Sequence, residues 1–145
     1  MSRTVIQPAN PNYAVDVTRV ITTLPIASLL GLEVSRLAPG EAELRLAFRE
    51  DLGIHGTFLG AIVGAAADFA GGCAAATLLP PSATNVTADY TVKLLTPARG
   101  EALIARASVL RAGRMTTVTK ADVYAVRGES HSLCATALVT MRNMS

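Results

Sequence analysis

The chain has 145 residues, which fits one domain, because single globular cores usually hold about 50 to 200 residues. Its 13 Lys and Arg against 11 Asp and Glu leave a net charge of +2, which is too small for a surface that binds nucleic acid by neutralising phosphates. Half of the residues are hydrophobic, yet they include 25 Ala beside 11 Gly and no Trp, which excludes disorder and predicts a core of small side chains.

The N-terminal residues 1–12 contain Pro8 and Pro11 among Asn and Gln, which predicts a flexible arm ahead of a single domain over residues 13–145. The arm has no apolar stretch, so we do not expect a secretory signal peptide.

The first helical pattern follows over residues 13–30. Its apolar residues recur at helical spacing: Val17, Val20, Ile21 and Leu24. Pro25 is expected to begin a second short helix, and Gly31 to end it.

Strand patterns occupy most of the remaining chain. The predicted strands are residues 32–37, 41–48, 84–95, 101–111, 115–126 and 132–141, and a loop over residues 49–57 contains His55. In the last strand one face carries Leu133, Ala135, Ala137, Val139 and Met141. With a long apolar segment at residues 58–79, this order predicts an α+β fold, an antiparallel meander around one central helix.

The central segment is long enough to cross a membrane, but Asp68 lies near its middle and no basic or aromatic belt flanks it. A helix wrapped by a sheet is therefore the better prediction. One stripe of this helix is apolar and is expected to be buried against the sheet: Phe58, Ile62, Ala65, Phe69, Cys73 and Ala76.

A second stripe of the same helix consists of Gly60, Gly64, Asp68, Gly71 and Gly72. Glycine costs about 1 kcal/mol in a helix interior, so four on one stripe indicate close approach by another helix or by a ligand. Asp68 is the only charge in the segment, and either it bonds a neighbouring backbone group or an Arg, or it belongs to a site.

The two cysteines, Cys73 and Cys134, lie in apolar runs without a CxxC partner, and the chain has only two His. This pattern predicts buried, reduced thiols in a metal-free cytosolic protein rather than a zinc site.

Residues 56–61 read Gly-Thr-Phe-Leu-Gly-Ala and are followed on the same helix by Ala67-Asp68. This resembles the hotdog-fold acyl-CoA thioesterases of the phenylacetate-degradation (PaaI-like) type, whose hallmark is Gly-Thr-Leu-His-Gly-Gly followed by Asp or Glu. Residues 87–98 resemble that family's strand ending in a Pro-Ala corner, and residues 109–114 resemble its basic hairpin. The resemblance covers roughly residues 28–142 with the motifs in the family's order.

Three positions depart from the family pattern. Its His is Leu59 here, its second glycine is Ala61, and the Asn or Gln of the preceding loop is Gly53. His55 is a candidate for a substitute polar group, with an ordinary exposed loop His as the alternative.

Thioester hydrolysis needs a carboxylate to activate water or to attack the carbonyl, and a donor for the developing oxyanion. Asp68 is the candidate general base or nucleophile, and the backbone N–H of Gly60 at the helix start is the candidate donor. Eight residues separate them, about 12 Å along a helix, so a site using both must be shared between two subunits. The resemblance independently implies a homodimer, often paired into a homotetramer, with sites at the dimer interface.

The remaining site residues come partly from the resemblance. Thr87 matches a position that carries a hydroxyl near the acidic residue, so it is expected to orient water or Asp68. The expected substrate-binding residues are His55, Leu59, Ala61, Gly64, Gly72, Arg111 and Arg114. The two arginines are candidates for holding the phosphates of coenzyme A, which enters as part of the substrate, and no other cofactor is expected.

Three functions compete at this point. The first is a cytoplasmic acyl-CoA thioesterase, and the second is an acyl-thioester binding protein that has lost turnover, as Leu59 and Gly53 suggest. The third is a dehydratase or hydratase of the same fold, which would need a His–carboxylate pair and is disfavoured because neither His55 nor His131 lies in a dehydratase-like context. No nucleic acid or membrane partner is expected.

Overall fold

A computed structural model describes residues 6–145, and their first elements are two helices, α1 (Tyr13–Thr23) and α2 (Pro25–Leu30). Pro25 stands at the start of α2, where its missing N–H costs nothing. Gly31, with φ of 81°, ends α2 and donates its N–H to the carbonyls of Ala27 and Ser28. Both predicted helices are confirmed. Residues 1–5 of the predicted arm lie outside the described residues, and the flexibility of the arm stays a prediction.

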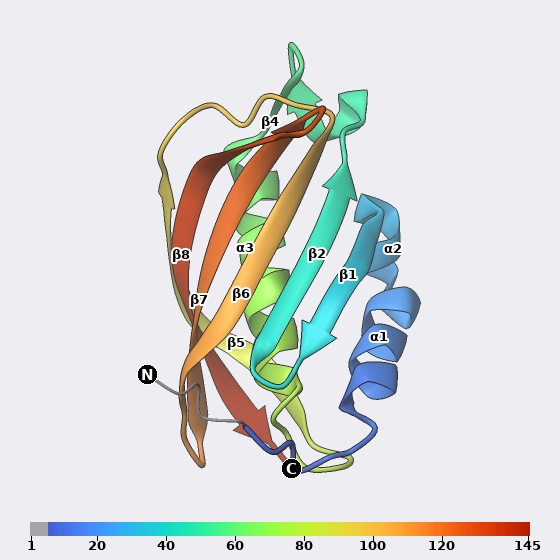
Figure 1. Ribbon diagram of the computed structural model, residues 1–145, viewed down its shortest axis with the longest axis vertical. Coiled ribbons are helices and arrows are strands. Elements are labelled where there is room, and N and C mark those ends of the chain that lie inside the picture. Colours follow the sequence, from blue (N-terminus) through green and yellow to red (C-terminus); the bar gives the residue numbers. More distant parts are fainter. Residues whose placement is uncertain (1–5) are drawn as a thin grey trace.

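One antiparallel sheet forms the body of the molecule (Figure 1). Its strands are β1 (Leu32–Ala38), β2 (Glu41–Ala47), β5 (Thr84–Leu94), β6 (Ala102–Ala112), β7 (Thr116–Arg127) and β8 (Ser130–Met144). They lie in the order β1-β2-β6-β7-β8-β5. The predicted meander is therefore wrong for β5, because β2 pairs with β6 and β5 crosses to the far edge beside β8.

The central helix α3 (Gly60–Ala76) lies against one face of this sheet, so the predicted central helix is confirmed with shorter ends. The expected loop before it contains a short 3-10 turn, η1 (Glu50–Leu52), and a small hairpin of β3 (Gly53–Ile54) and β4 (Thr57–Phe58). Beyond its C-terminal end, the buried Thr77 hydroxyl donates to the carbonyl of Ala74 and accepts the N–H of Gly40 at 2.8 Å.

The face of α3 that packs on the sheet is made of small side chains. Its most buried side chains are Val63, Ala66, Ala67, Ala70, Ala74 and Ala75. The predicted apolar stripe is correct for Phe58 and Cys73, but its other members are only half-buried. The buried face is rotated about the helix axis relative to the predicted one. The prediction followed the larger apolar residues, because alanine contributes little to a hydrophobicity pattern, yet alanine side chains allow the closest packing.

Gly71 explains part of the glycine content of α3. A Cβ at Gly71 would lie 2.6 Å from the Thr119 hydroxyl on β7 and 2.9 Å from Val139 on β8. At this position the close approach is by the sheet, which corrects the prediction of another helix or a ligand. The short distance between α3 and the sheet depends on this missing side chain.

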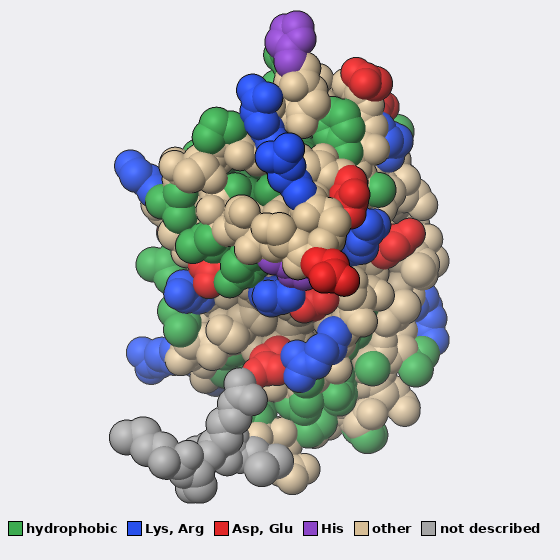
Figure 2. Space-filling model, turned by 45° about the horizontal axis from the view of Figure 1, so that its top comes forward, with side chains coloured by type: hydrophobic (Ala, Val, Ile, Leu, Met, Phe, Trp, Pro, Cys, Tyr) green, Lys and Arg blue, Asp and Glu red, His purple; other side chains and the backbone are tan. Residues whose placement is uncertain are grey.

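The opposite, outer face of the sheet is polar. Figure 2 shows basic and acidic side chains intermingled there, and they include the ion pairs Arg36–Glu41, Arg106–Glu43 and Lys120–Asp122. Within residues 6–145, no helix is both long enough and apolar enough to span a membrane.

Candidate active site

Asp68 and Thr87 are brought together by the packing of α3 against β5. The Thr87 hydroxyl donates a hydrogen bond to Asp68 Oδ1 at 2.7 Å. The residues are 19 apart in sequence and lie on different elements, so only the tertiary structure creates the pair. Among residues 6–145, the Asp68 side chain makes no hydrogen bond to a backbone group or to an Arg, which was the first of the two alternatives for this residue.

A β-bulge in β5 sets the direction of Thr87. The pairing of β5 with β8 shifts register between Thr87 and Asp89, which leaves Ala88 as an extra residue. Side chains alternate along a strand, so the extra residue allows both Thr87 and Tyr90 to face α3. Tyr90 and Val92 lie 3.8 Å from where a Cβ of Gly64 would be, which places them on this same face. Without the bulge, Thr87 and these apolar side chains could not share it.

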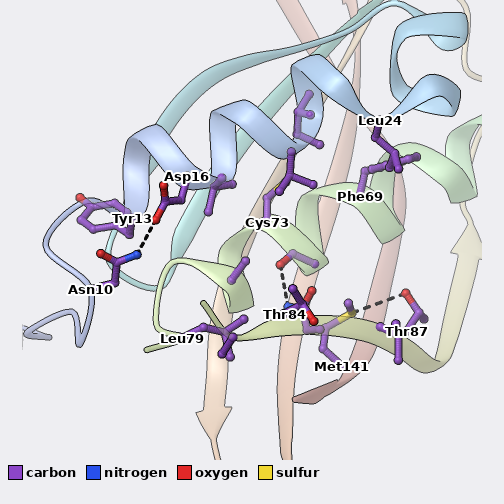
Figure 3. A pocket seen from close by; sticks show the side chains of 18 of the residues that line it. Asn10, Tyr13, Asp16, Leu24, Phe69, Cys73, Leu79, Thr84, Thr87 and Met141 are labelled. Atoms are coloured by element: carbon purple, nitrogen blue, oxygen red, sulfur yellow. Dashed lines mark hydrogen bonds between the residues drawn. The ribbon is translucent and has the colours of Figure 1, made fainter. Parts of the chain in front are cut away.

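A cavity of about 490 Å³ opens beside the Asp68–Thr87 pair, between α1, α3 and the first half of β5 (Figure 3). Its walls are mostly apolar: Val17, Val20, Ile21, Leu24, Phe69, Cys73, Ala76, Leu79 and Met141. Gly72 also lines it, so the structure brings three predicted site residues to one place. Asn85 also lines the cavity and donates its side-chain N–H to the Gly72 carbonyl at 3.2 Å.

The Cys73 thiol lies in the wall of this cavity but is poorly suited to nucleophilic chemistry. Burial raises the pKa of this thiol to about 12, so it stays protonated near neutral pH. Because a thiol reacts as the thiolate, Cys73 acts as an apolar wall residue. Of Cys73 and Asp68, the carboxylate of Asp68 is therefore the group that can act as a base.

Gly60 is the first residue of α3, and Leu59 before it provides no side-chain cap. The first N–H groups of a helix have no partner within it, and the Gly60 residue is exposed. Gly60 lines a second hollow of about 300 Å³ with Leu94 and Pro97. This hollow is at the opposite end of α3 from the deep part of the first cavity, so one chain does not bring Gly60 and Asp68 together.

Leu59, Ala61 and Gly64 surround Gly60 on the first turns of α3. Leu59 and Ala61 are exposed, whereas Gly64 is buried beneath Tyr90 of β5. Their predicted contact with substrate therefore depends on what covers this end of the helix.

His55 lies at the tip of the β3–β4 hairpin, exposed and with a positive φ of 51°. In the same hairpin, a Cβ at Gly53 would overlap the carbonyl oxygen of Thr57 on the paired strand. The hairpin thus has no room for the family's Asn or Gln at this position.

Arg111 and Arg114 lie at the β6–β7 hairpin, both exposed, beyond the C-terminal end of α3. Arg114 lines a surface hollow of about 470 Å³ with Leu79 and Asn143. Within one chain the arginines are therefore separated from Gly60 by the length of the helix.

Sequence reasoning missed several residues of the main cavity. Asn10, Asp16, Asn85 and Met141 line it, and none carries a sequence signal for this role. The helical period of α1 did identify Val17, Val20, Ile21 and Leu24 as one apolar face, although it could not show what that face covers.

The model of the thioesterase superfamily matches residues 55–130 of the chain. A solved thioesterase family protein from Silicibacter pomeroyi is 33% identical, with 91% of this chain and 98% of that chain covered and a TM-score of 0.88. A search among curated proteins found no match.

More distant solved structures share the fold. A thioesterase from Haemophilus influenzae is 21% identical, with 100% of this chain and 93% of that chain covered and a TM-score of 0.79. A phenylacetic acid degradation-related protein from Ralstonia eutropha is 22% identical, with 87% and 98% covered and a TM-score of 0.73. Together with the family match, these likenesses confirm the predicted α+β hotdog fold.

Proposed function

Since the chain belongs to the thioesterase superfamily, we propose that it hydrolyses an acyl-CoA thioester to the free acid and coenzyme A. Asp68 acts as general base or nucleophile, and the Gly60 N–H of a second subunit stabilises the oxyanion. The observation that carries this proposal is the Asp68–Thr87 pair at the edge of an apolar cavity.

The hydrogen bonds of Asp68 leave one of its oxygens available for chemistry. Thr87 donates to Oδ1, and among residues 6–145 no donor bonds Oδ2. Thr87 thereby holds the carboxylate in one orientation, while Oδ2 can accept a proton from water or attack the thioester carbonyl. In either case the carbonyl oxygen gains negative charge and needs a donor.

The edge of β5 supports a shared site. In the described part of the chain no strand pairs with its outer side, and it carries exposed apolar side chains at Val86, Tyr90 and Leu94. An unpaired edge of this kind is a template for pairing with a second copy. If two β5 strands pair antiparallel, their α3 helices also run antiparallel, and the Gly60 end of one helix approaches the middle of the other.

The same pairing gives a role to the exposed arginines of the β6–β7 hairpin. It moves the Arg111–Arg114 hairpin of one subunit toward the Gly60 end of its partner, where phosphates of coenzyme A need cations. The entrance of the shared site would then be bordered by His55, Leu59, Ala61 and Gly64, and Gly72 lies in the cavity. We propose a homodimer or homotetramer acting in the cytoplasm without a separate cofactor.

A degenerate acyl-thioester binding protein is the second candidate. It is favoured by the apolar Leu59 at the family's His position and by the lack of space for a side chain at Gly53. Both features remove polar side chains that the family pattern places near the thioester, while the cavity remains.

Turnover of acyl-CoA thioesters separates the two candidates. Release of free coenzyme A is followed over a panel of short, medium and aromatic acyl-CoAs for the wild type and for Asp68→Ala and Asp68→Asn. Loss of a positioned base should lower kcat by about 10²- to 10⁴-fold in both variants. Equal rates for the wild type and Asp68→Ala across the panel would exclude hydrolysis by this site.

The shared site is tested at Gly60. Gly60→Pro removes the N–H but keeps a residue tolerated at the first helical position, and the extended Leu59 (ψ 145°) is compatible with a following Pro. Gly60→Ala is the matched control, because it adds the same Cβ near Leu94 and retains the N–H. We expect Gly60→Pro to be inactive and Gly60→Ala to remain active.

Mixing inactive variants shows whether the two groups come from different subunits. Re-equilibrated Asp68→Ala and Gly60→Pro should regain about a quarter of the wild-type activity, since half of the dimers are mixed and each restores one of two sites. No recovery in a mixture that exchanges subunits would contradict the shared site.

A further inference from the structure

We propose that the cavity between α1 and α3 is the acyl-chain site and that it selects straight medium-chain acyl groups of roughly 8 to 10 carbons. This inference rests on the proposed thioesterase function and adds the substrate class. It is supported by the composition of the cavity walls, by the length of the cavity and by the polar groups at its far end.

The walls come from two helices that run in opposite directions. In Figure 3, Leu24 of α1 and Phe69 of α3 face each other at the end where Thr87 lies, and Tyr13 and Leu79 lie at the other end. Between the two ends, both helices present apolar side chains such as Ile21 and Cys73. With about 490 Å³, the cavity is within the range of small-molecule sites, about 300–1,000 Å³.

The length of the cavity follows from the helices. On α3 it extends from Asp68 to Ala76, eight residues; on α1 it extends from Leu24 to Tyr13 and reaches the carboxylate of Asp16 after eight residues. At about 1.5 Å per residue, the α3 wall and the part of the α1 wall up to Asp16 are each about 12 Å long. An extended carbon chain advances about 1.25 Å per bond, from a bond of about 1.5 Å and an angle near 111°, so about ten carbons span this length.

The position of Asp68 and Thr87 in the cavity determines which end of the acyl chain carries the thioester carbonyl. Asp68, Thr87 and Gly72 line the same cavity, so a thioester carbonyl beside Asp68 directs its acyl group along α3. Gly72 leaves this path open, because a Cβ there would lie 3.2 Å from the methyl group of Met141, which also lines the cavity.

Polar groups close the far end. Asn10 is buried and donates its side-chain N–H to Asp16 Oδ2 at 2.8 Å, and Tyr13 lies beside them (Figure 3). A longer chain would have to remove water from the Asp16 carboxylate without replacing its hydrogen bonds, which is unfavourable. Up to that point, each buried methylene should tighten binding by a factor of about four.

The test fills the cavity from α1. Val20 lines the cavity and Val15 does not, yet both are exposed valines of α1, at 56% and 59%. Val20→Trp should therefore block the chain path, and Val15→Trp is its matched control. Val20→Phe is a milder substitution, and thermal unfolding of all three variants checks that they fold.

Two measurements keep this inference separable from the proposed function. The first is the dissociation constant of non-hydrolysable S-alkyl-CoA thioethers with 4 to 14 carbons, which needs no turnover. The second is kcat/KM over acyl-CoAs of the same lengths. For the wild type and Val15→Trp we expect the tightest binding and highest kcat/KM at about 8 to 10 carbons, with the optimum moved to about four carbons in Val20→Trp.

The possible results have distinct meanings. Length-dependent binding without turnover would support the acyl site while overturning the hydrolase. Turnover with the same length profile in Val20→Trp, Val20→Phe and Val15→Trp would overturn the acyl site while leaving the hydrolase intact. A preference for phenylacetyl over every straight chain would also overturn the inferred substrate class.

Discussion

Among single residues of the cavity, Cys73 and Asp68 differ in burial, and this difference decides which of the two side chains is suited to act as a base. Cys73 and Asp68 both line it, but Cys73 is almost completely buried and its pKa is raised to about 12. Asp68 is only partly buried and its carboxylate is held by the Thr87 hydroxyl. The thiol therefore remains neutral, while among residues 6–145 no donor bonds the second oxygen of Asp68.

The buried thiol predicts a pH dependence of stability. Above a pH of about 9, the thiol of the unfolded chain loses its proton, whereas folded Cys73 keeps it up to a pH of about 12. The unfolded state then binds fewer protons, so the free energy of unfolding falls with rising pH, by up to about 1.4 kcal/mol per pH unit. Urea unfolding at pH 8, 9 and 10 should show a steeper fall for the wild type than for Cys73→Ala.

Cys134 serves as the comparison for this prediction. Burial also raises its pKa, so Cys134→Ala should flatten the pH dependence as well, and the double variant should flatten it most. Identical slopes in the wild type and Cys73→Ala would show that the Cys73 thiol is not shielded from water.

At the scale of elements, the glycines of α3 have different roles. Gly71 allows the helix to approach β7 and β8, whereas the Cβ position of Gly64 lies at ordinary contact distance, 3.8 Å, from Tyr90. Both are buried in the same helix, so helix propensity acts equally on them while the available space differs.

Alanine substitutions at these two glycines should have opposite effects. Gly71→Ala places a methyl group too close to Thr119 and Val139 and should destabilise the protein by about 1–3 kcal/mol. Gly64→Ala should be neutral or stabilising by up to about 1 kcal/mol, because alanine favours the helix. Urea denaturation of both variants measures the difference, and equal destabilisation would contradict close packing at Gly71.

For the molecule as a whole, the proposed dimer depends on the position of β5 at the edge of the sheet. The strand carries the exposed side chains of Tyr90 and Leu94 on the side facing α3, and its outer edge has no partner among residues 6–145. A second copy could satisfy both features at once. The proposed catalytic site then depends on the dimer, because one chain separates Asp68 from Gly60 by about 12 Å.

Two leucines of equal exposure test this interface. Leu94 on β5 is 54% exposed and Leu138 on the outer face of the sheet is 52% exposed. Leu94→Glu should shift the molecule to monomers and abolish turnover, because it places charge in the proposed interface. Leu138→Glu should leave the dimer intact. Sedimentation at micromolar concentration measures both, and a dimer of unchanged stability in Leu94→Glu would place the interface elsewhere.

Local sequence patterns predicted the helices and the six long strands of this protein. The helix over residues 13–30 broken at Pro25, the central helix with Asp68, and the strands after it were all predicted from periodicity and from Gly and Pro positions. These signals are local, since neighbouring residues share a helix turn or a strand face. The motif at residues 56–61, through its resemblance to the hotdog thioesterases, also predicted the fold.

Which of these elements pack against one another follows from long-range contacts. The pairing of β5 with β8 rather than β2 depends on contacts between residues about fifty apart in the chain, which no local pattern records. Two bulges then turn side chains over: Ala88 allows Thr87 to face α3, and a shift near Cys134 buries that residue while Leu133 is exposed, against the predicted alternation. The Asp68–Thr87 pair and the cavity under α1 follow from these long-range contacts, because packing fixes them together.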